Sequence, residues 1–135
     1  MSDPLSGHWI LDRSRSSFSA HAPAAWELFI EADSAGMSVE ERLTQAGGAT
    51  LHVRFSPKFD GGDWPVTGSP LFDSIAVLRP QVGRLDVTAR KSGAIAIRDT
   101  TEVSTDDGRL TIRFEVFAEQ RVVATGLAVF ARAPG

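Results

Sequence analysis

Apolar and polar residues alternate along most of this chain, the pattern of a β-strand with one buried and one solvent-facing side. In residues 25–33, AWELFIEAD, Trp26, Leu28 and Ile30 lie on one face, whereas Glu27 and Glu31 lie on the other. The same alternation predicts strands in residues 37–44, 49–56, 73–79, 84–90, 94–104, 109–119 and 122–132. No segment of helical length carries an apolar stripe with a helical period, so we expect very little helix.

Short turn sequences separate these predicted strands, for example DSAG (33–36), KSG (91–93) and DDG (106–108). Short connections favour antiparallel neighbours, because parallel strands need long crossovers. We therefore predict an all-β fold with one domain over residues 1–135, an antiparallel up-and-down barrel of about eight to ten strands. Closure into a barrel would remove exposed strand edges. A β-sandwich is the alternative architecture.

The segment 55–73, FSPKFDGGDWPVTGSPLFD, interrupts the alternation with three prolines and three glycines. It lacks the Lys-Ser/Thr pair and the following helix of a phosphate-binding loop. It also lacks the alternating oxygen ligands of a calcium loop. We interpret it as a stiff connection whose aromatic residues, Phe59, Trp64 and Phe72, close the barrel or contact a ligand at its rim.

Three segments together resemble a family of small bacterial lipocalin-like β-barrel proteins of largely undefined function. They are GHWILDRSRSSFS (7–19), FDGGDWPVTGSPLFDSIAVLR (59–79) and VSTDDGRLTI (103–112). The resemblance implies a small barrel with an internal cavity, and it implies no catalytic residues. The chain departs from the family pattern at Asp12, where Asn is usual, and at Trp64, where Tyr is usual.

The composition argues against several classes of function. Hydrophobic residues make up 42% and charged residues 23%, which is typical of a soluble globular protein. The net charge of -3 argues against non-specific nucleic-acid binding, and no apolar run is long enough to span a membrane. The absence of cysteine excludes thiolate chemistry and disulfides. Without a recognisable secretory signal at its start, the chain is expected to be cytoplasmic.

Several carboxylates fall on the apolar side of predicted strands. Glu41 shares parity with Val39, while Asp73 and Asp99 share parity with the apolar residues of their own strands. A carboxylate in such a place is costly unless it is paired or protonated, so these three are candidate catalytic acids, bases or ligand anchors. Arg79 is the expected partner of Asp73. The structural alternative is a salt bridge, or a β-bulge that turns the side chain outward.

Other residues complete the candidate site. Thr101 and Thr125 share the inward parity of their strands, although only Thr101 is assigned to the site. The candidate ligand-binding residues are Trp26, Trp64, Phe72, Arg79, Thr101 and Phe114. The three histidines lack any ligand spacing, so no metal is expected, and no G-x-S-x-G motif marks a nucleophilic serine. No cofactor is expected.

These features predict a barrel that binds a hydrophobic small molecule in an apolar cavity. The alternative is a cofactor-free enzyme, a cyclase, isomerase or hydratase, that uses one of the carboxylates to move a proton. A third interpretation is a filled, structural barrel that uses its surface for association, for example as a homodimer. Neither nucleic acid nor a membrane is an expected partner.

Overall fold

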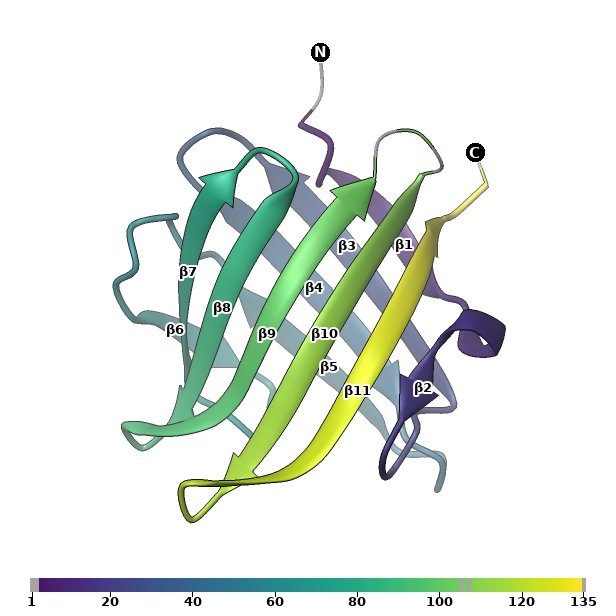
Figure 1. Cartoon of the computed structure of the whole chain (residues 1–135), viewed down its shortest axis with the longest axis vertical. Helices are drawn as coiled ribbons and strands as arrows, with labels where there is room; N and C mark the ends of the chain where they lie inside the picture. Colours follow the sequence, from purple (N-terminus) through teal and green to yellow (C-terminus); the bar gives the residue numbers. More distant parts are fainter. Residues whose placement is uncertain (1–2, 105, 107, 135) are drawn as a thin grey trace.

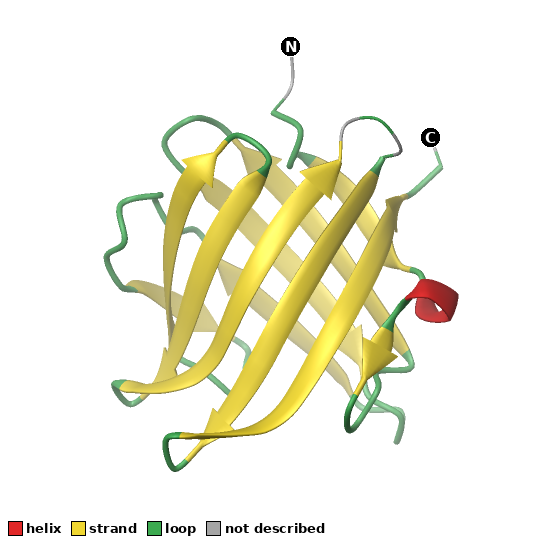
Figure 2. Ribbon diagram, in the orientation of Figure 1, coloured by secondary structure: helices red, strands yellow, loops and turns green. Residues whose placement is uncertain are grey.

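The computed structural model describes residues 3–104, 106 and 108–134. Within these residues the chain forms β-strands and one short 3-10 helix, η1 (Arg13–Arg15) (Figures 1 and 2). The strands are β1 (Gly7–Leu11), β2 (Ser17–Phe18), β3 (Ala25–Ala32), β4 (Met37–Thr44), β5 (Thr50–Phe55), β6 (Trp64–Thr67), β7 (Ser74–Gln81), β8 (Arg84–Lys91), β9 (Ala94–Ser104), β10 (Arg109–Ala118) and β11 (Arg121–Arg132). The predicted strands thus form within a residue or two of their expected bounds. No helix of the described part is long and apolar enough to cross a membrane.

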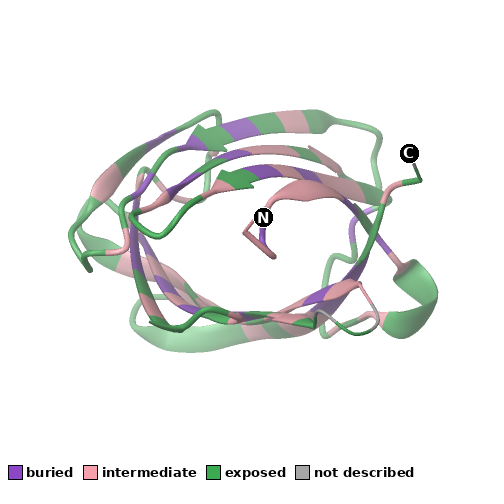
Figure 3. Ribbon diagram, turned by 90° about the horizontal axis from the view of Figure 1, so that it is seen from above, coloured by how far each residue is buried: buried purple, intermediate pink, exposed green. Residues whose placement is uncertain are grey.

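The strands close into an antiparallel barrel. In the described chain, β1 and then β3 to β11 follow one another around the ring, and β1 pairs with β11 to complete it. The closing register joins Trp9 to Arg132 and Leu11 to Phe130. The short strand β2 lies beside β11, where Phe18 pairs with Gly126. The barrel prediction is confirmed and the sandwich alternative is wrong; Figure 3 shows the closed ring from above.

We call the two ends of the barrel by their place in Figure 1. The upper end carries the loops 33–36 and 82–83, and the lower end carries the loops 45–49, 92–93 and 119–120. The interior of the upper half is filled with large apolar side chains. Those with almost no accessible surface are Leu5, Trp9, Val77, Leu85, Leu110 and Phe130.

The segment before β1 lies over the upper opening of the ring in the view from above (Figure 3). Asp3 accepts two hydrogen bonds from the Arg79 guanidinium, both of 2.8 Å. Leu5 is completely buried, and its carbonyl accepts a 3.0 Å hydrogen bond from the Trp9 indole. Arg132 lies over the Trp9 ring, 4.2 Å from its centroid, and donates to two carbonyls of the same segment. Residues 3–9 therefore form a plug.

Two sequence-based expectations are wrong. Arg79 points inward at the upper end and pairs with Asp3, whereas Asp73 lies in an exposed position just before β7, where it accepts a hydrogen bond from the Ser92 N–H. Thr125 is exposed, because in β11 the interior positions are those of Gly126, Ala128 and Phe130. The apolar residue Val129 on the opposite face is buried because its backbone pairs with the segment around η1, which covers that wall.

The glycine- and proline-rich segment 55–73 is a structural connection that contains the short strand β6. Its first part is joined to the upper end, where Phe59 N–H bonds the Ala35 carbonyl. Its second part turns at Gly68, which has a φ of +87°. A Cβ atom at Gly68 would collide with the carbonyl oxygen of His52 in β5. The glycine here is therefore required by both backbone conformation and close approach.

Replacing Gly68 by Ala is expected to lower the free energy of unfolding by about 2–4 kcal/mol, since it adds a strained φ and an overlap with backbone. The matched control is Gly47→Ala, at an exposed turn position with open space around the site of its Cβ. That variant should change stability by less than about 1 kcal/mol. Urea unfolding of both variants measures the difference, and equal stabilities would contradict the role given to Gly68.

Candidate functional site

Two of the predicted carboxylates face the interior of the barrel from different walls. Glu41 lies in β4, where it pairs with Leu28 of β3 and Val53 of β5, both buried. Asp99 lies in β9, where it pairs with Val87 and Phe114 on its two neighbouring strands. Because side chains alternate along a strand, Asp99 shares the interior with Thr101 and not with its immediate neighbours.

Each carboxyl is held by one neutral donor. The indole N–H of Trp26 donates a 2.9 Å hydrogen bond to Glu41 Oε1. The Thr101 hydroxyl donates a 2.9 Å hydrogen bond to Asp99 Oδ1. Among the described residues, neither carboxyl forms a salt bridge, and the second oxygen of each has no hydrogen-bond partner. Each acid therefore keeps one oxygen for another molecule.

Burial changes the acidity of both groups. Desolvation raises the pKa of Glu41 to about 7, against the lowering effect of the Trp26 hydrogen bond. Desolvation also raises the pKa of Asp99 to about 7, against the Thr101 hydrogen bond, and the negative charges of Glu41 and Asp86 raise it further. Burial is therefore the main reason that both carboxyls have a pKa near neutral pH.

The lower half of the barrel differs from the filled upper half. Inward-facing side chains there keep part of their surface accessible although strands surround them. The half-buried residues on this inner face are Phe18, Trp26, Glu41, Leu43, Leu51, Ile97, Asp99, Ile112, Phe114 and Val116. We use the name lower chamber for this group of inward-facing residues. Two aromatic contacts shape it: Trp26 meets Phe130 edge to face at 5.1 Å, and Phe18 lies 6.0 Å from Phe114.

The structure gathers five of the sequence-predicted residues around the lower chamber: Glu41, Asp99, Trp26, Thr101 and Phe114. The other four, Asp73, Arg79, Trp64 and Phe72, lie elsewhere in the fold. The gathered five come from β3, β4, β9 and β10, so no single stretch of sequence contains the site.

Asp73 and Arg79 lie apart from the chamber. Asp73 is exposed beside the 92–93 turn, and Arg79 belongs to the contacts that hold the plug. Arg79 also donates to the carbonyls of Asp33 and Val82. These contacts give both residues structural roles.

Trp64 and Phe72, in the glycine- and proline-rich segment, are half-buried against the core. The Trp64 indole donates a 3.1 Å hydrogen bond to Asp60, and Lys58 lies 5.7 Å from its ring centroid. Both contacts stay within the segment itself, so they fix its shape.

Sequence reasoning did not include several chamber residues in the site. Strand parity was sufficient to place Leu43, Leu51 and Ile97 inside, but it gave no depth along the barrel. The sequence pattern does not predict that Phe18 faces the interior, because its strand has only two residues and is defined by its pairing with β11.

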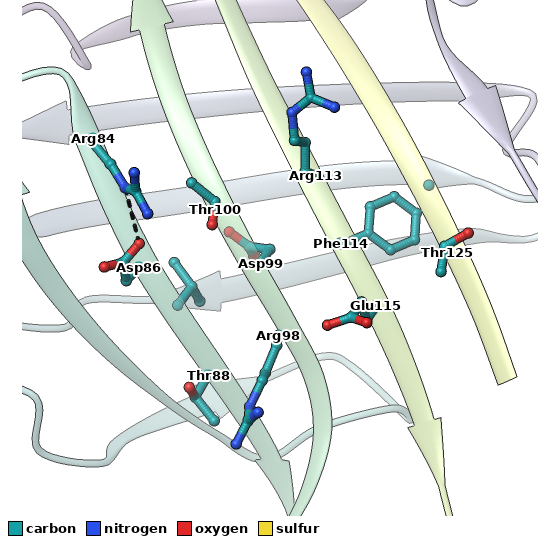
Figure 4. Close-up of a pocket in the computed structure, with 12 residues that line it drawn as sticks. Arg84, Asp86, Thr88, Arg98, Asp99, Thr100, Arg113, Phe114, Glu115 and Thr125 are labelled. Atoms are coloured by element: carbon teal, nitrogen blue, oxygen red, sulfur yellow. Dashed lines mark hydrogen bonds and ion pairs between the residues drawn. The ribbon is translucent and has the colours of Figure 1, made fainter. Parts of the chain in front are cut away.

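An open depression lies on the outer wall over β8 to β11 (Figure 4). Most of its lining consists of charged and hydroxyl side chains: Arg84, Asp86, Thr88, Arg98, Thr100, Arg113, Glu115 and Thr125. Val87, Asp99, Phe114 and Gly126 line it as well. Arg84 pairs with Asp86 at 3.2 Å, so part of this charge is already neutralised. Asp99 and Phe114 border both this depression and the chamber, and the negative charge of Asp86 raises the pKa of Asp99. We place the candidate site in the chamber.

In the described part of the chain, no group of three or more His, Cys, Asp and Glu residues is arranged to hold a metal ion. The chamber therefore offers apolar surface, aromatic rings, one hydroxyl and two carboxyls. The class of protein that these observations define is a closed antiparallel β-barrel with two acids in its interior. Comparison with protein-family models and with curated proteins gave no match.

Proposed function

We propose that the barrel binds a small apolar molecule in the lower chamber, with a hydrogen-bond-donating head group at Glu41 and Asp99. The observation that carries this proposal is the pair of interior carboxyls, each with one oxygen free of partners among the described residues. A donor group on a bound molecule would add a hydrogen bond to each of these two oxygens. The surrounding half-buried apolar side chains supply a complementary surface for the rest of the molecule.

The charge of the chamber restricts the ligand class. Its inner face carries two acids, and neither acid has an Arg, Lys or His partner among the described residues. An anionic head group would be repelled and desolvated there, whereas an alcohol or amine would donate to the free oxygens. The proposed ligand is therefore an apolar alcohol or amine.

Titration with 1-decanol, decylamine and decanoate, below their aggregation concentrations, tests this proposal. We expect saturable binding of the first two and at least tenfold weaker binding of decanoate, reported by Trp26 fluorescence. Trp64→Phe should keep the signal and Trp26→Phe should lose most of it, because only Trp26 contacts a chamber carboxyl. In the double variant Glu41→Gln, Asp99→Asn, decanoate should no longer be disfavoured. Absence of saturable binding for all three compounds would contradict the proposal.

The same carboxyl pair supports a second function, cofactor-free acid/base catalysis on the bound molecule. General acids and bases work best with a pKa near the operating pH, and both groups lie at about 7. One ionised carboxyl would accept a proton from the substrate while the protonated one returns a proton, as in an isomerase, cyclase or lyase. A bound compound recovered unchanged after long incubation favours binding alone; conversion that Asp99→Asn abolishes without loss of binding favours catalysis.

A further inference from the structure

Among the described residues, the plug occupies the upper end of the barrel. Leu5 and Trp9 fill it and have no accessible surface. The side chains of Arg79 and Asp3, which hold the plug, are only 9% and 11% exposed. Arg132 holds the carbonyls of Pro4 and Ser6 at 2.8 Å. A molecule that entered from above would have to displace the whole plug.

Strand register orders the interior along the barrel axis. The next inward-facing residue below Glu41 in β4 is Leu43, which pairs with Leu51 of β5. The next inward-facing residue below Asp99 in β9 is Ile97, which pairs with Ala89 of β8 and Val116 of β10. These side chains form an apolar ring nearer the lower end. They separate the two carboxyls from the lower loops.

At the next inward-facing positions above the two carboxyls, buried side chains fill the interior of the barrel. Thr101 is 7% exposed and pairs with Leu85, which is 2% exposed. In β4 the corresponding residue is Val39, which is 7% exposed and pairs with Phe55, at 9%. The carboxyls of Glu41 and Asp99 therefore lie at the floor of the lower chamber, and the apolar ring lies at its mouth.

We infer that the ligand enters through the lower end with its polar head first, so that its apolar tail remains in the ring at the mouth. This inference rests on the proposed function and adds the orientation of the ligand. A head at the floor meets the two acids, and a tail at the mouth meets Leu43, Leu51, Ile97 and Val116. The opposite orientation would bury the tail against two carboxyls and leave them without donors. The site therefore tolerates substituents on the tail end and rejects them on the head.

Two decylamine probes test the orientation. One carries a dansyl group on the terminal tail carbon and has a free amine; the other carries the dansyl group on the nitrogen. We expect the tail-labelled probe to bind within about threefold of decylamine, and the head-labelled probe to bind at least tenfold more weakly. Equal binding of the two probes, or preference for the head-labelled one, overturns the inference.

The route of access is tested with single cysteines, because the chain has none of its own. Ala46→Cys places a bulky maleimide label on the lower loop 45–49, and Ala35→Cys places the same label on the upper loop 33–36, both at exposed positions. The lower label should slow decylamine association at least tenfold, whereas the upper label should change it less than twofold. The reverse result overturns the inference while leaving the proposed function intact. Failure of the unlabelled wild type to bind decylamine overturns both.

Discussion

Replacing Asp99 by Asn is expected to make the barrel more stable at pH 8 by about 3 kcal/mol, and to change its stability little at pH 4. The pKa of Asp99 rises from 3.8 to about 7 on folding, chiefly because burial disfavours its charge. Each pKa unit corresponds to about 1.4 kcal/mol, and partial access to solvent reduces the total. Asn keeps an oxygen that can accept the Thr101 hydrogen bond. The ionised Asp99 carboxyl therefore lowers the free energy of unfolding at pH 8.

The sign of the pH dependence follows from linkage. Below about pH 4 the carboxyl of Asp99 is protonated in both states and contributes nothing. Between about pH 4 and pH 7 the unfolded chain loses the proton while the folded chain keeps it, so the free energy of unfolding falls as the pH rises. Above about pH 7 the carboxyl of Asp99 is ionised in both states, and the free energy of unfolding falls no further on its account. The pKa of Glu41 is raised from 4.5 to about 7, so this residue also makes the free energy of unfolding fall as the pH rises between these values.

Urea unfolding of wild type and Asp99→Asn at pH 4, 6 and 8 measures this effect as the difference between the two proteins. Using the difference removes the contribution of all other carboxylates. Glu102→Gln, an exposed position three residues further along the same strand, is the control and should give a difference that changes little with pH. A difference between wild type and Asp99→Asn that stays constant from pH 4 to pH 8 would show that Asp99 is ionised without penalty.

Replacing Arg79 by Ala is expected to cost about 3 kcal/mol of stability and to release the plug. The guanidinium makes two hydrogen bonds to Asp3, binds the carbonyls of Asp33 and Val82, and lies 5.2 Å from the Phe59 ring. Its removal leaves a nearly buried carboxylate without a cation, which is strongly destabilising. Hydrogen exchange should become faster at the Leu5 and Ser6 amides, since their segment is no longer held.

The control for this change is Arg90→Ala, which breaks an ion pair of the same 2.8 Å length with Asp63. That pair is exposed, with side chains 31% and 56% accessible, so its loss should cost less than about 1 kcal/mol. The double variant Asp3→Asn, Arg79→Ala should recover part of the stability lost by Arg79→Ala alone, because no unpaired charge remains. Equal losses from Arg79→Ala and Arg90→Ala would show that burial of the Asp3 pair adds nothing.

The regular part of the fold was predictable from the sequence because each strand must present one apolar face. Alternation placed Trp26, Leu28 and Ile30 on the same side, and all three pack in or against the core. The alternation failed in β11, where both Val129 and Phe130 are buried. One of them faces the interior, and the other lies under the segment around η1. A pattern along one strand does not reveal what covers its outer face.

The candidate site was only partly predictable. Parity identified Glu41 and Asp99 as inward-facing, since Glu41 shares its strand face with Val39 and Leu43, and Asp99 shares its face with Ile97 and Val103. Parity also suggested Asp73, but β7 begins at Ser74, so this residue lies outside the strand and escapes the alternation. The partner of Arg79 was not predictable, because Asp3 is 76 residues away and reaches it only through the fold of the plug.

By itself, the sequence determined that this protein is built from antiparallel strands and that it carries carboxylates on apolar faces. Both properties follow from the order of neighbouring residues, which fixes the side of a strand on which each side chain lies. The tertiary structure alone decided that the sheet closes between β1 and β11, that residues 3–9 are held at one end by Arg79, and that Glu41 lies close enough for its charge to act on Asp99. These depend on strand register and on contacts between distant segments, which set depth and distance in the barrel. The raised pKa of each acid arises from that shared, desolvated space.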